Sequence, residues 1–232
     1  MKVLKPLIFA CFVSAAMSAA AVTPQEISDK AMEGYRLFTR DSLPDDRPRG
    51  YSMMLEAAWE GDAKAANNIG WLKERGDFTE KDLPGALQWY ERAADQGLPA
   101  AALNYVGMIF RHPESLEGRQ ADIRRVAQAA MTAGKAMAMG RGLPYDYRQG
   151  EDLMMRAALL GDEEAALTIA QQLEMYPDSF SYLPLRTITE ECDALLPTEH
   201  KNLQPGTSAE TLAQRMLTPE FWYARVAEDI RL

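Results

Sequence analysis

The sequence is poor in the two residue types that most often carry nucleophilic or metal chemistry. Its 232 residues include two cysteines and two histidines. Cys11 lies in an apolar N-terminal stretch, so Cys192 would be alone in a processed chain, and an internal disulfide is excluded. No Gly-x-Ser-x-Gly elbow, phosphate-binding loop or His-x-x-x-His pair is present, and His112 and His200 lie in expected loops. We therefore predict no catalytic residues, no metal ligands and no cofactor, and so no enzyme.

Basic residues are also scarce relative to acidic ones. The chain has 25 lysines and arginines against 34 aspartates and glutamates, a formal net charge of -9. This balance argues against binding to nucleic acid or to anionic membrane surfaces, and it mildly favours a basic protein partner. No stretch approaches the roughly 20 apolar residues that a membrane-spanning helix needs. We therefore predict no membrane span, and we expect a monomer.

The first 21 residues have the composition of a secretory signal peptide. Lys2 and Lys5 precede an apolar run that ends in the small residues Ala19 to Ala21. Cleavage before Val22 would remove both lysines and shift the net charge from -9 to -11. We therefore expect a periplasmic or secreted protein. The alternative is a lipid attached at Cys11, which would place the protein at a membrane surface.

What the sequence does contain is a spacing that occurs three times. In each copy an Asp is followed, at fixed distances, by a small residue, a large apolar residue, an Ala-Ala pair, a Gly and a further Ala. The copies are Asp46, Gly50, Met53, Ala57, Ala58, Gly61 and Ala65; Asp82, Ala86, Trp89, Ala93, Ala94, Gly97 and Ala101; and Asp146, Gly150, Leu153, Ala157, Ala158, Gly161 and Ala165. Similarity at a fixed spacing indicates a repeat array, and such arrays usually present a surface to a partner.

Each copy specifies one helix with both ends marked. The side chains of Asp46, Asp82 and Asp146 can accept hydrogen bonds from the free amides of a first turn. The Gly that follows 15 residues later can take the left-handed conformation that ends a helix. We expect a helix of about four turns, roughly 21 Å long. The small residue four positions after each Asp would let a second helix approach closely.

That second helix lies upstream of each Asp. Its marker is a small residue, and apolar residues lie five and one positions before the marker and three after it in most units. The markers are Gly34, Gly70, Gly107, Gly134 and Ala170, with steps of 36, 37, 27 and 36 residues. Because the third unit is about nine residues short, we expect its second helix, within residues 112–128, to be abbreviated or skewed.

This pattern resembles the Sel-one-like (Sel1-like) repeat family, short relatives of tetratricopeptide repeats whose units are antiparallel helix pairs. The best matches run from Ile69-Gly70 through Asp82 to Gly97, and from Gly140-Arg141-Gly142-Leu143 through Asp146 to Gly161. The resemblance implies an all-α fold. The expected architecture is a right-handed α-solenoid of about four Sel1-like, tetratricopeptide-like repeats with a helical C-terminal cap.

The expected organisation has three parts: a signal peptide over 1–21, a solenoid over 22–174, and a C-terminal loop with capping helices over 175–232. Thr23-Pro24-Gln25-Glu26 is a capping box that would start the first helix. We predict a short helix from Ile188 to Leu196 and two more starting at Thr207 and Thr218. A solenoid needs its terminal apolar face covered, which favours a cap. The alternative is that residues 176–206 form a loop that contacts the partner.

The outward face of the first helix in each unit is the candidate binding surface. Residues three positions before the marker, one after it and four after it point away from the predicted buried positions. In the family the equivalent helices line the concave surface, as the resemblance implies. The predicted partner-binding residues are Trp71, Glu74, Asn104, Met108, Arg111, Lys135 and Gln171. Trp71 and Met108 would be the anchors. The alternative for Trp71 is packing under the helix of residues 23–40.

These observations favour an exported protein that binds a protein partner through its concave helical surface. The resemblance implies either a periplasmic regulator that binds a sensor or an immunity-type inhibitor that blocks a secreted toxin. The alternative class is a cell-wall-associated enzyme, or an enzyme accessory, that uses the C-terminal region.

Overall fold

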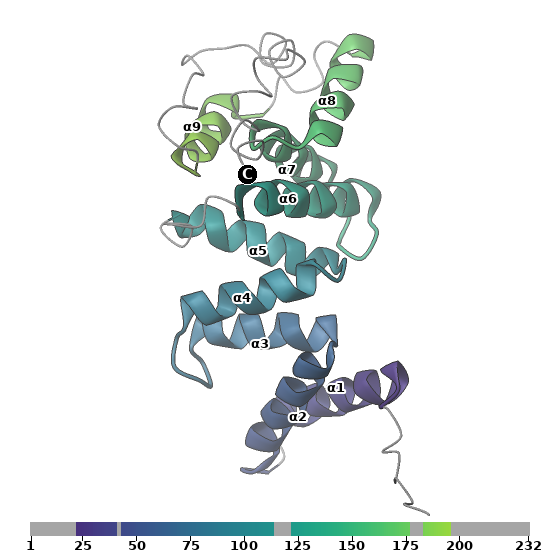
Figure 1. The fold of residues 1–232 in the computed structure, drawn as a ribbon, viewed down its shortest axis with the longest axis vertical. Helices are drawn as coiled ribbons and strands as arrows, with labels where there is room; N and C mark the ends of the chain where they lie inside the picture. The colour runs from purple at the N-terminus through teal and green to yellow at the C-terminus, as the bar shows by residue number, and fades with distance from the viewer. Residues whose placement is uncertain (1–21, 41–42, 114–121, 177–182, 196–232) are drawn as a thin grey trace, which may run out of the picture.

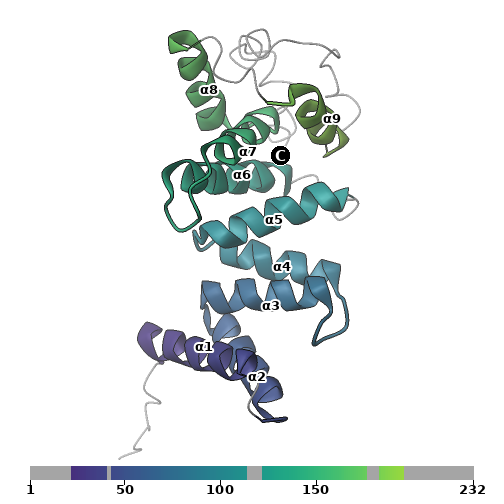
Figure 2. The same ribbon diagram turned by 180° about the vertical axis from the view of Figure 1, so that it is seen from behind.

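The computed structural model describes residues 22–40, 43–113, 122–176 and 183–195, and every regular element within these ranges is a helix. The helices are α1 (Pro24–Thr39), α2 (Asp46–Glu60), α3 (Ala63–Arg75), α4 (Leu83–Ala94), α5 (Pro99–Arg111), α6 (Asp122–Met139), α7 (Tyr147–Leu159), α8 (Glu163–Met175) and α9 (Leu185–Leu195). From α3 to α8 they stack in chain order along the long axis, with α1 and α2 together at one end and α9 beside α7 and α8 at the other (Figure 1), and the view from behind shows the same arrangement (Figure 2). The predicted all-α solenoid is confirmed.

The most extensive helix–helix contacts are those of α1 with α2, α3 with α4, and α6 with α7. In two of them glycine faces glycine where the helices cross. A Cβ on Gly34 would lie 2.8 Å from the carbonyl oxygen of Gly50, and a Cβ on Gly134 would lie 2.8 Å from that of Gly150. The prediction that small residues at these positions allow close approach is therefore confirmed.

Most of the residues predicted to cap the N-termini of helices do so. Thr23 forms the capping box of α1. The carboxylates of Asp82 and Asp146 each accept a hydrogen bond from the backbone N–H three residues later, at 2.9 and 3.0 Å. The prediction for Asp46 is wrong. The N-cap residue of α2 is Asp45, whose backbone is already in the right-handed helical region and whose side chain makes no capping hydrogen bond. Asp46 therefore lies inside the first turn.

The glycine helix stops are confirmed. Gly61, Gly97 and Gly161 have φ angles of 111°, 80° and 103°, in the region that favours glycine. Two caps were missed by the sequence pattern. Asp62 and Asp162 follow two of these glycines directly, and each caps the next helix by accepting a hydrogen bond three residues on, at 2.7 and 2.8 Å. A Gly-Asp pair thus ends one helix and starts another.

The short third unit differs from the expectation. Residues 122–128 are the first turns of α6, which runs unbroken for 18 residues. They do not form a separate short helix, and residues 114–121 lie outside the described part of the chain. As a result α6 packs against both α5 and α7, and α5 lies between α4 and α6.

Buried side chains form two hydrophobic clusters that meet at α4 and the start of α5. Trp89 and Ala93 belong to the cluster that runs from α1 to Ala101 of α5, whereas Leu87 and Tyr90 belong to the cluster that extends to α9. Trp89 is 8% exposed and packs edge-on against Trp59, with ring centroids 4.7 Å apart. Trp89, the large apolar residue of the second copy of the repeated spacing, is therefore a core residue.

The described C-terminal part packs against the solenoid. Ile188, Cys192 and Leu195 of α9 are buried in the second cluster, and α9 contacts α7. Arg156 of α7 donates a hydrogen bond to Glu191 of α9 at 2.5 Å. The helix predicted from residue 188 is thus present and begins at residue 185. The helices predicted at residues 207 and 218, residues 177–182 and 196–206 of the alternative partner loop, and the signal peptide lie outside the described residues.

Candidate interaction groove

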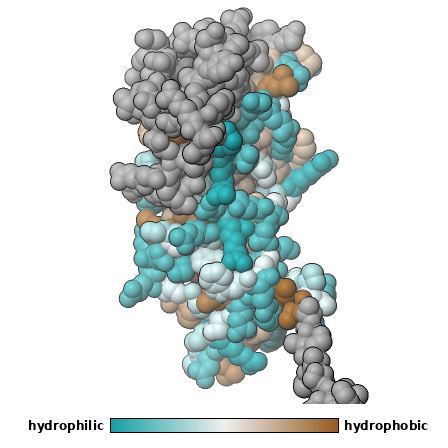
Figure 3. Space-filling view, viewed as in Figure 1, coloured by the Kyte–Doolittle hydropathy of each residue, from teal (hydrophilic) through white to brown (hydrophobic). Residues whose placement is uncertain are grey.

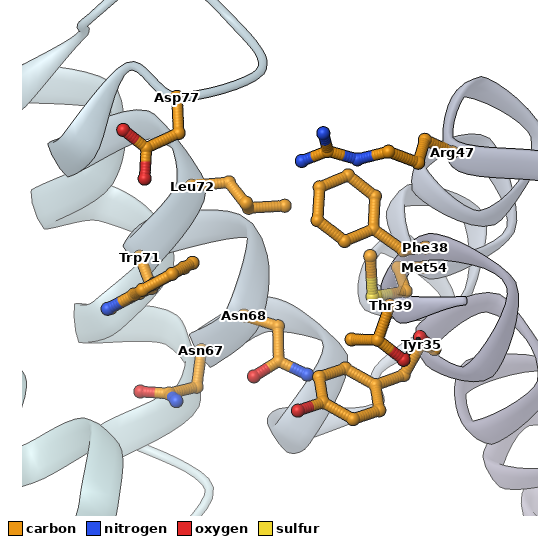
Figure 4. A pocket seen from close by; sticks show the side chains of 10 residues that line it. All are labelled: Tyr35, Phe38, Thr39, Arg47, Met54, Asn67, Asn68, Trp71, Leu72 and Asp77. Atoms are coloured by element: carbon orange, nitrogen blue, oxygen red, sulfur yellow. Dashed lines mark hydrogen bonds between the residues drawn. The ribbon is translucent and has the colours of Figure 1, made fainter. Parts of the chain in front are cut away.

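Two clefts lie side by side between α1 and α3. One has a volume of about 520 Å³ and the other about 650 Å³, and Tyr35, Asn67 and Asn68 line both. Figure 4 shows the side chain of Tyr35 and that of Asn68 approaching each other from opposite walls. We call the two clefts together the α1–α3 groove. The smaller one is the aromatic cleft, and the larger one is the small-residue cleft.

The aromatic cleft offers an apolar surface with a cation beside it. Phe38, Met54 and Leu72 are buried and line the cleft, and Trp71 forms part of its α3 wall (Figure 4). The guanidinium of Arg47 lies over the Phe38 ring, 4.8 Å from its centroid. Such a site suits a large apolar side chain, because it combines hydrophobic area with a polarised rim.

The small-residue cleft is bounded by elements that are distant in the sequence. Ala31 of α1 and Ala65 of α3 are buried at its lining, and Leu98 and the start of α5 form another side. The loop between α6 and α7 reaches this point. A Cβ on its Gly142 would lie 3.3 Å from Cγ of Pro99, so the loop rests on the first turn of α5 and adds a wall to the cleft.

Large hydrophobic side chains are exposed around the groove. Met32 is 66% exposed, Tyr35 52% and Trp71 43%. Figure 3 shows that hydrophilic residues dominate the described part of the face turned toward the viewer, with hydrophobic residues in small separate patches. Three large apolar residues are thus exposed beside one groove, as is common at interaction sites.

Three predicted binding residues instead connect neighbouring helices. Asn104 of α5 donates a hydrogen bond to the side-chain oxygen of Asn67 of α3 at 2.9 Å. Arg111 of α5 donates to Glu74 of α3 at 2.5 Å. Each pair is separated by 37 residues, the step between two units, so these side chains fix one unit against the next.

Glu74 is further engaged by Tyr90. The phenol hydroxyl of Tyr90 donates a hydrogen bond to Glu74 at 2.7 Å. Burial, together with this hydrogen bond, raises the pKa of the Tyr90 phenol well above its usual range. Glu74 therefore accepts hydrogen bonds from α4 and α5 at once. Its carboxylate links these helices and is already engaged within the protein.

The remaining polar residues of the predicted stripe are more accessible. Lys135 of α6 pairs with Glu164 of α8, and Gln171 is exposed on α8. Trp71 is exposed, and the guanidinium of Arg75 lies 4.7 Å from its ring centroid. The alternative in which Trp71 is packed under α1 is wrong, since Trp71 lines an open cleft between α1 and α3.

The prediction that Met108 points outward is wrong. Met108 is 0% exposed and belongs to the second buried cluster. The pattern assumed that every first helix has the same neighbours, but α5 is covered by both α4 and α6. Met131 of α6, on the same outward stripe, is also buried, at 4% exposure.

The groove residues that the sequence analysis missed include Met32, Tyr35, Arg47, Lys64 and Asn68. For Tyr35 a signal was present, because it follows the marker Gly34 as Trp71 follows Gly70, and the same offset rule would have found it. The others carry no comparable signal. Their role depends on α1 facing α3 across the groove, which spacing within one helix does not reveal.

Chemistry-bearing side chains do not gather at this groove. Within the described ranges, no three His, Cys, Asp or Glu residues are grouped so as to hold a metal ion. Cys192 is buried in α9 and forms no disulfide with a described residue, and Glu151 is buried in α7 and bonded to Gln172 of α8. None of the described helices is both long and apolar enough to cross a bilayer.

The fold defines a class: an α-solenoid assembled from antiparallel helix pairs. Residues 63–98, which include α3 and α4, and residues 127–162, which include α7 and most of α6, match the Sel1 repeat family. These two matches support a relationship of the chain to the Sel1-like repeat family. Sel1 repeats generally mediate protein–protein interaction, and proteins built from them are typically scaffolds without enzymatic activity.

Solved structures of this kind are similar to the chain at low sequence identity. A Sel1 repeat protein from Oxalobacter formigenes is 21% identical, with 90% of each chain covered and a TM-score of 0.37. The protective antigen c5321 of uropathogenic Escherichia coli, which displays the same repeat fold, is 17% identical. Its match covers 88% of this chain and 54% of the antigen, with a TM-score of 0.33. No curated protein sequence matches the chain.

Proposed function

We propose that this protein is exported and binds a protein partner in the α1–α3 groove. In that role it acts either as a periplasmic regulator of a sensor or as an immunity-type inhibitor of a secreted toxin. The observation that carries the proposal is the groove itself: two adjoining clefts rimmed by Met32, Tyr35 and Trp71. One wall, α3, lies within a match to the Sel1 repeat, a repeat that generally mediates protein–protein interaction.

The distribution of side chains supports this site over the rest of the predicted stripe. Asn104, Glu74 and Arg111 are engaged between helices, and Met108 is buried. Trp71 is accessible and sits beside a cleft, the position in which aromatic residues act as binding anchors. Export is supported by residues 1–21, and cleavage before Val22 would leave the capping box of α1 intact.

Affinity capture from the periplasm, followed by mass spectrometry, tests the proposal and identifies the partner. The mass of the exported chain in the same sample shows whether cleavage precedes Val22. Trp71→Ala and Tyr35→Ala should each weaken binding of the captured partner by about 2 kcal/mol, roughly 30-fold, as anchors do.

Trp59→Ala is the matched control, because Trp59 is 62% exposed and lines neither cleft. Thermal melting of each variant separates lost binding from lost folding. If Trp59→Ala weakens binding as much as Trp71→Ala does, the groove is not the site.

A further inference from the structure

Some of the charged side chains that line the α1–α3 groove have partners within the protein, and others have no ion-pair partner among the described residues. Five charged residues line it: Arg36, Arg47, Asp62, Lys64 and Asp77. Three of them have partners within the protein: Arg36 binds Glu33 through two hydrogen bonds, Asp62 caps α3, and Asp77 pairs with Arg75.

Arg47 and Lys64 form no ion pair with any described residue. Arg47 lies at the aromatic cleft, over the Phe38 ring, and Lys64 at the small-residue cleft, so each cleft has one cation without a carboxylate partner among the described residues. Both lining carboxylates are already engaged. The whole chain carries a net charge of -9, which favours a basic partner. Inside the groove, however, the charged groups that have no ion-pair partner among the described residues, Arg47 and Lys64, are both positive.

Uncommitted amides lie between the two clefts. Asn67 accepts a hydrogen bond from Asn104, and its own amide nitrogen donates none to a described residue. Asn68 forms no side-chain hydrogen bond within the described chain, and Figure 4 shows its carboxamide facing the groove. A carboxamide can donate and accept at once, which suits a peptide backbone with free N–H and C=O groups. A helical partner has few such groups to offer, whereas an extended one has many.

We infer that the groove binds an extended, acidic peptide segment of the partner, an inference that rests on the proposed function of the same site. In an extended segment, side chains two residues apart point the same way, about 6.6 Å apart. One large apolar side chain would enter the aromatic cleft and a second the small-residue cleft. The backbone between them would bind Asn67 and Asn68, and flanking carboxylates would pair with Arg47 and Lys64.

Fluorescence anisotropy with three labelled peptides tests this inference on the chain of residues 22–232. The probe is acetyl-GDFSLEG-amide. One control, acetyl-GKFSLKG-amide, reverses its charges, and the other, acetyl-GDGSGEG-amide, removes its apolar side chains. We expect the probe to bind at least tenfold more tightly than either control and to lose affinity as salt rises.

Variants of the two cations supply the second arm. Replacing both, Arg47→Gln with Lys64→Gln, should weaken probe binding about tenfold, since each exposed ion pair contributes modestly. The charge-conserving pair, Arg47→Lys with Lys64→Arg, should keep most of the affinity. Asn68→Ala should weaken it, and Arg148→Gln, on the exposed side of α7, should leave it unchanged.

Equal or tighter binding of the lysine peptide, or no binding of any peptide, overturns the inference. So does a double glutamine variant that binds the probe normally. These failures differ from failure of the proposed function: if Trp71→Ala loses the captured partner while the double glutamine variant retains it, the groove is the site but its ligand is not acidic.

Discussion

Gly34 and Gly50 show how a missing methyl group sets the distance between two helices. In the α1–α2 pair, a Cβ on Gly50 would lie 2.5 Å from both the carbonyl oxygen of Gly34 and the backbone nitrogen of Phe38. In the α3–α4 pair, Ala86 takes the place of the second glycine and the ring of Tyr90 packs against Gly70. The same position thus decides whether backbone or side chain forms the contact.

Gly50→Ala should lower the free energy of unfolding by about 2 kcal/mol or more, because rigid backbone must separate to admit the methyl group. Gly107→Ala is a control with the opposite expected sign. A Cβ there would meet only the flexible end of Arg111, at 3.1 Å, and alanine favours a helix over glycine by about 0.5–1 kcal/mol. Urea denaturation measures both. If Gly50→Ala is stabilising, the close α1–α2 contact described above is incorrect.

At the scale of a helix, Asp82 joins two elements. Its carboxylate caps α4 through the Gly85 N–H at 2.9 Å and also accepts a hydrogen bond from Lys73 of α3 at 2.9 Å. Asp82→Ala should therefore lower the free energy of unfolding by about 1–2 kcal/mol. Asp46→Ala should have a smaller effect, about 0.5 kcal/mol, since Asp46 only faces the dipole of α2. Equal losses at the two positions would show that capping is not the cause.

The acid dependence of stability follows from the same carboxylate. The hydrogen bond from Lys73 and that from Gly85 hold the pKa of Asp82 below its ordinary range. Because the folded pKa is the lower one, ionised Asp82 stabilises the fold above about pH 4, and this contribution is lost as the pH falls through the folded value. Asp82→Asn keeps a capping oxygen but removes the charge. Its unfolding curve should therefore depend less on pH between about 2 and 5 than that of the parent protein.

Helix ends were predictable because they depend on neighbours in the chain. Asp82, Asp146 and the stop glycines act within one turn, so their spacing was enough. Asp46 was misassigned because the helical backbone starts one residue earlier, which composition does not show. Met108 was misassigned because its burial depends on α6 packing directly against α5, a consequence of the short third unit.

At the scale of the molecule, the groove combines parts that no single repeat contains. Tyr35 comes from α1, Trp71 from α3, Leu98 from the start of α5 and Gly142 from the loop after α6. The sequence predicted that first helices would face a partner. It did not predict that α1 and α3 enclose two clefts, because that depends on how the units are rotated relative to one another.

The two buried clusters indicate that stability is divided along the solenoid, with α4 and the start of α5 shared between them. Trp89 of α4 packs with α1 to α3, whereas Leu159 of α7 is buried in the cluster of α4 to α9. Repeat arrays derive stability from contacts between adjacent units, so a local loss should remain local. Substitution of Trp89 or of Leu159 should therefore destabilise only the part of the solenoid whose cluster contains that residue.

Trp89→Ala, with an expected loss of about 3–5 kcal/mol, should speed amide hydrogen exchange mainly in α2 and α3. Leu159→Ala, with a loss of about 2–5 kcal/mol, should speed exchange mainly in α6 and α8. Exchange followed by mass spectrometry on peptic fragments measures both variants with the same fragments, so each is the control of the other. Exchange in α4 should rise in both, because α4 contributes to both clusters. If either substitution accelerates exchange equally from α1 to α9, the protein opens as one cooperative unit. In that case α4 joins the clusters too strongly for the groove-bearing end to open separately.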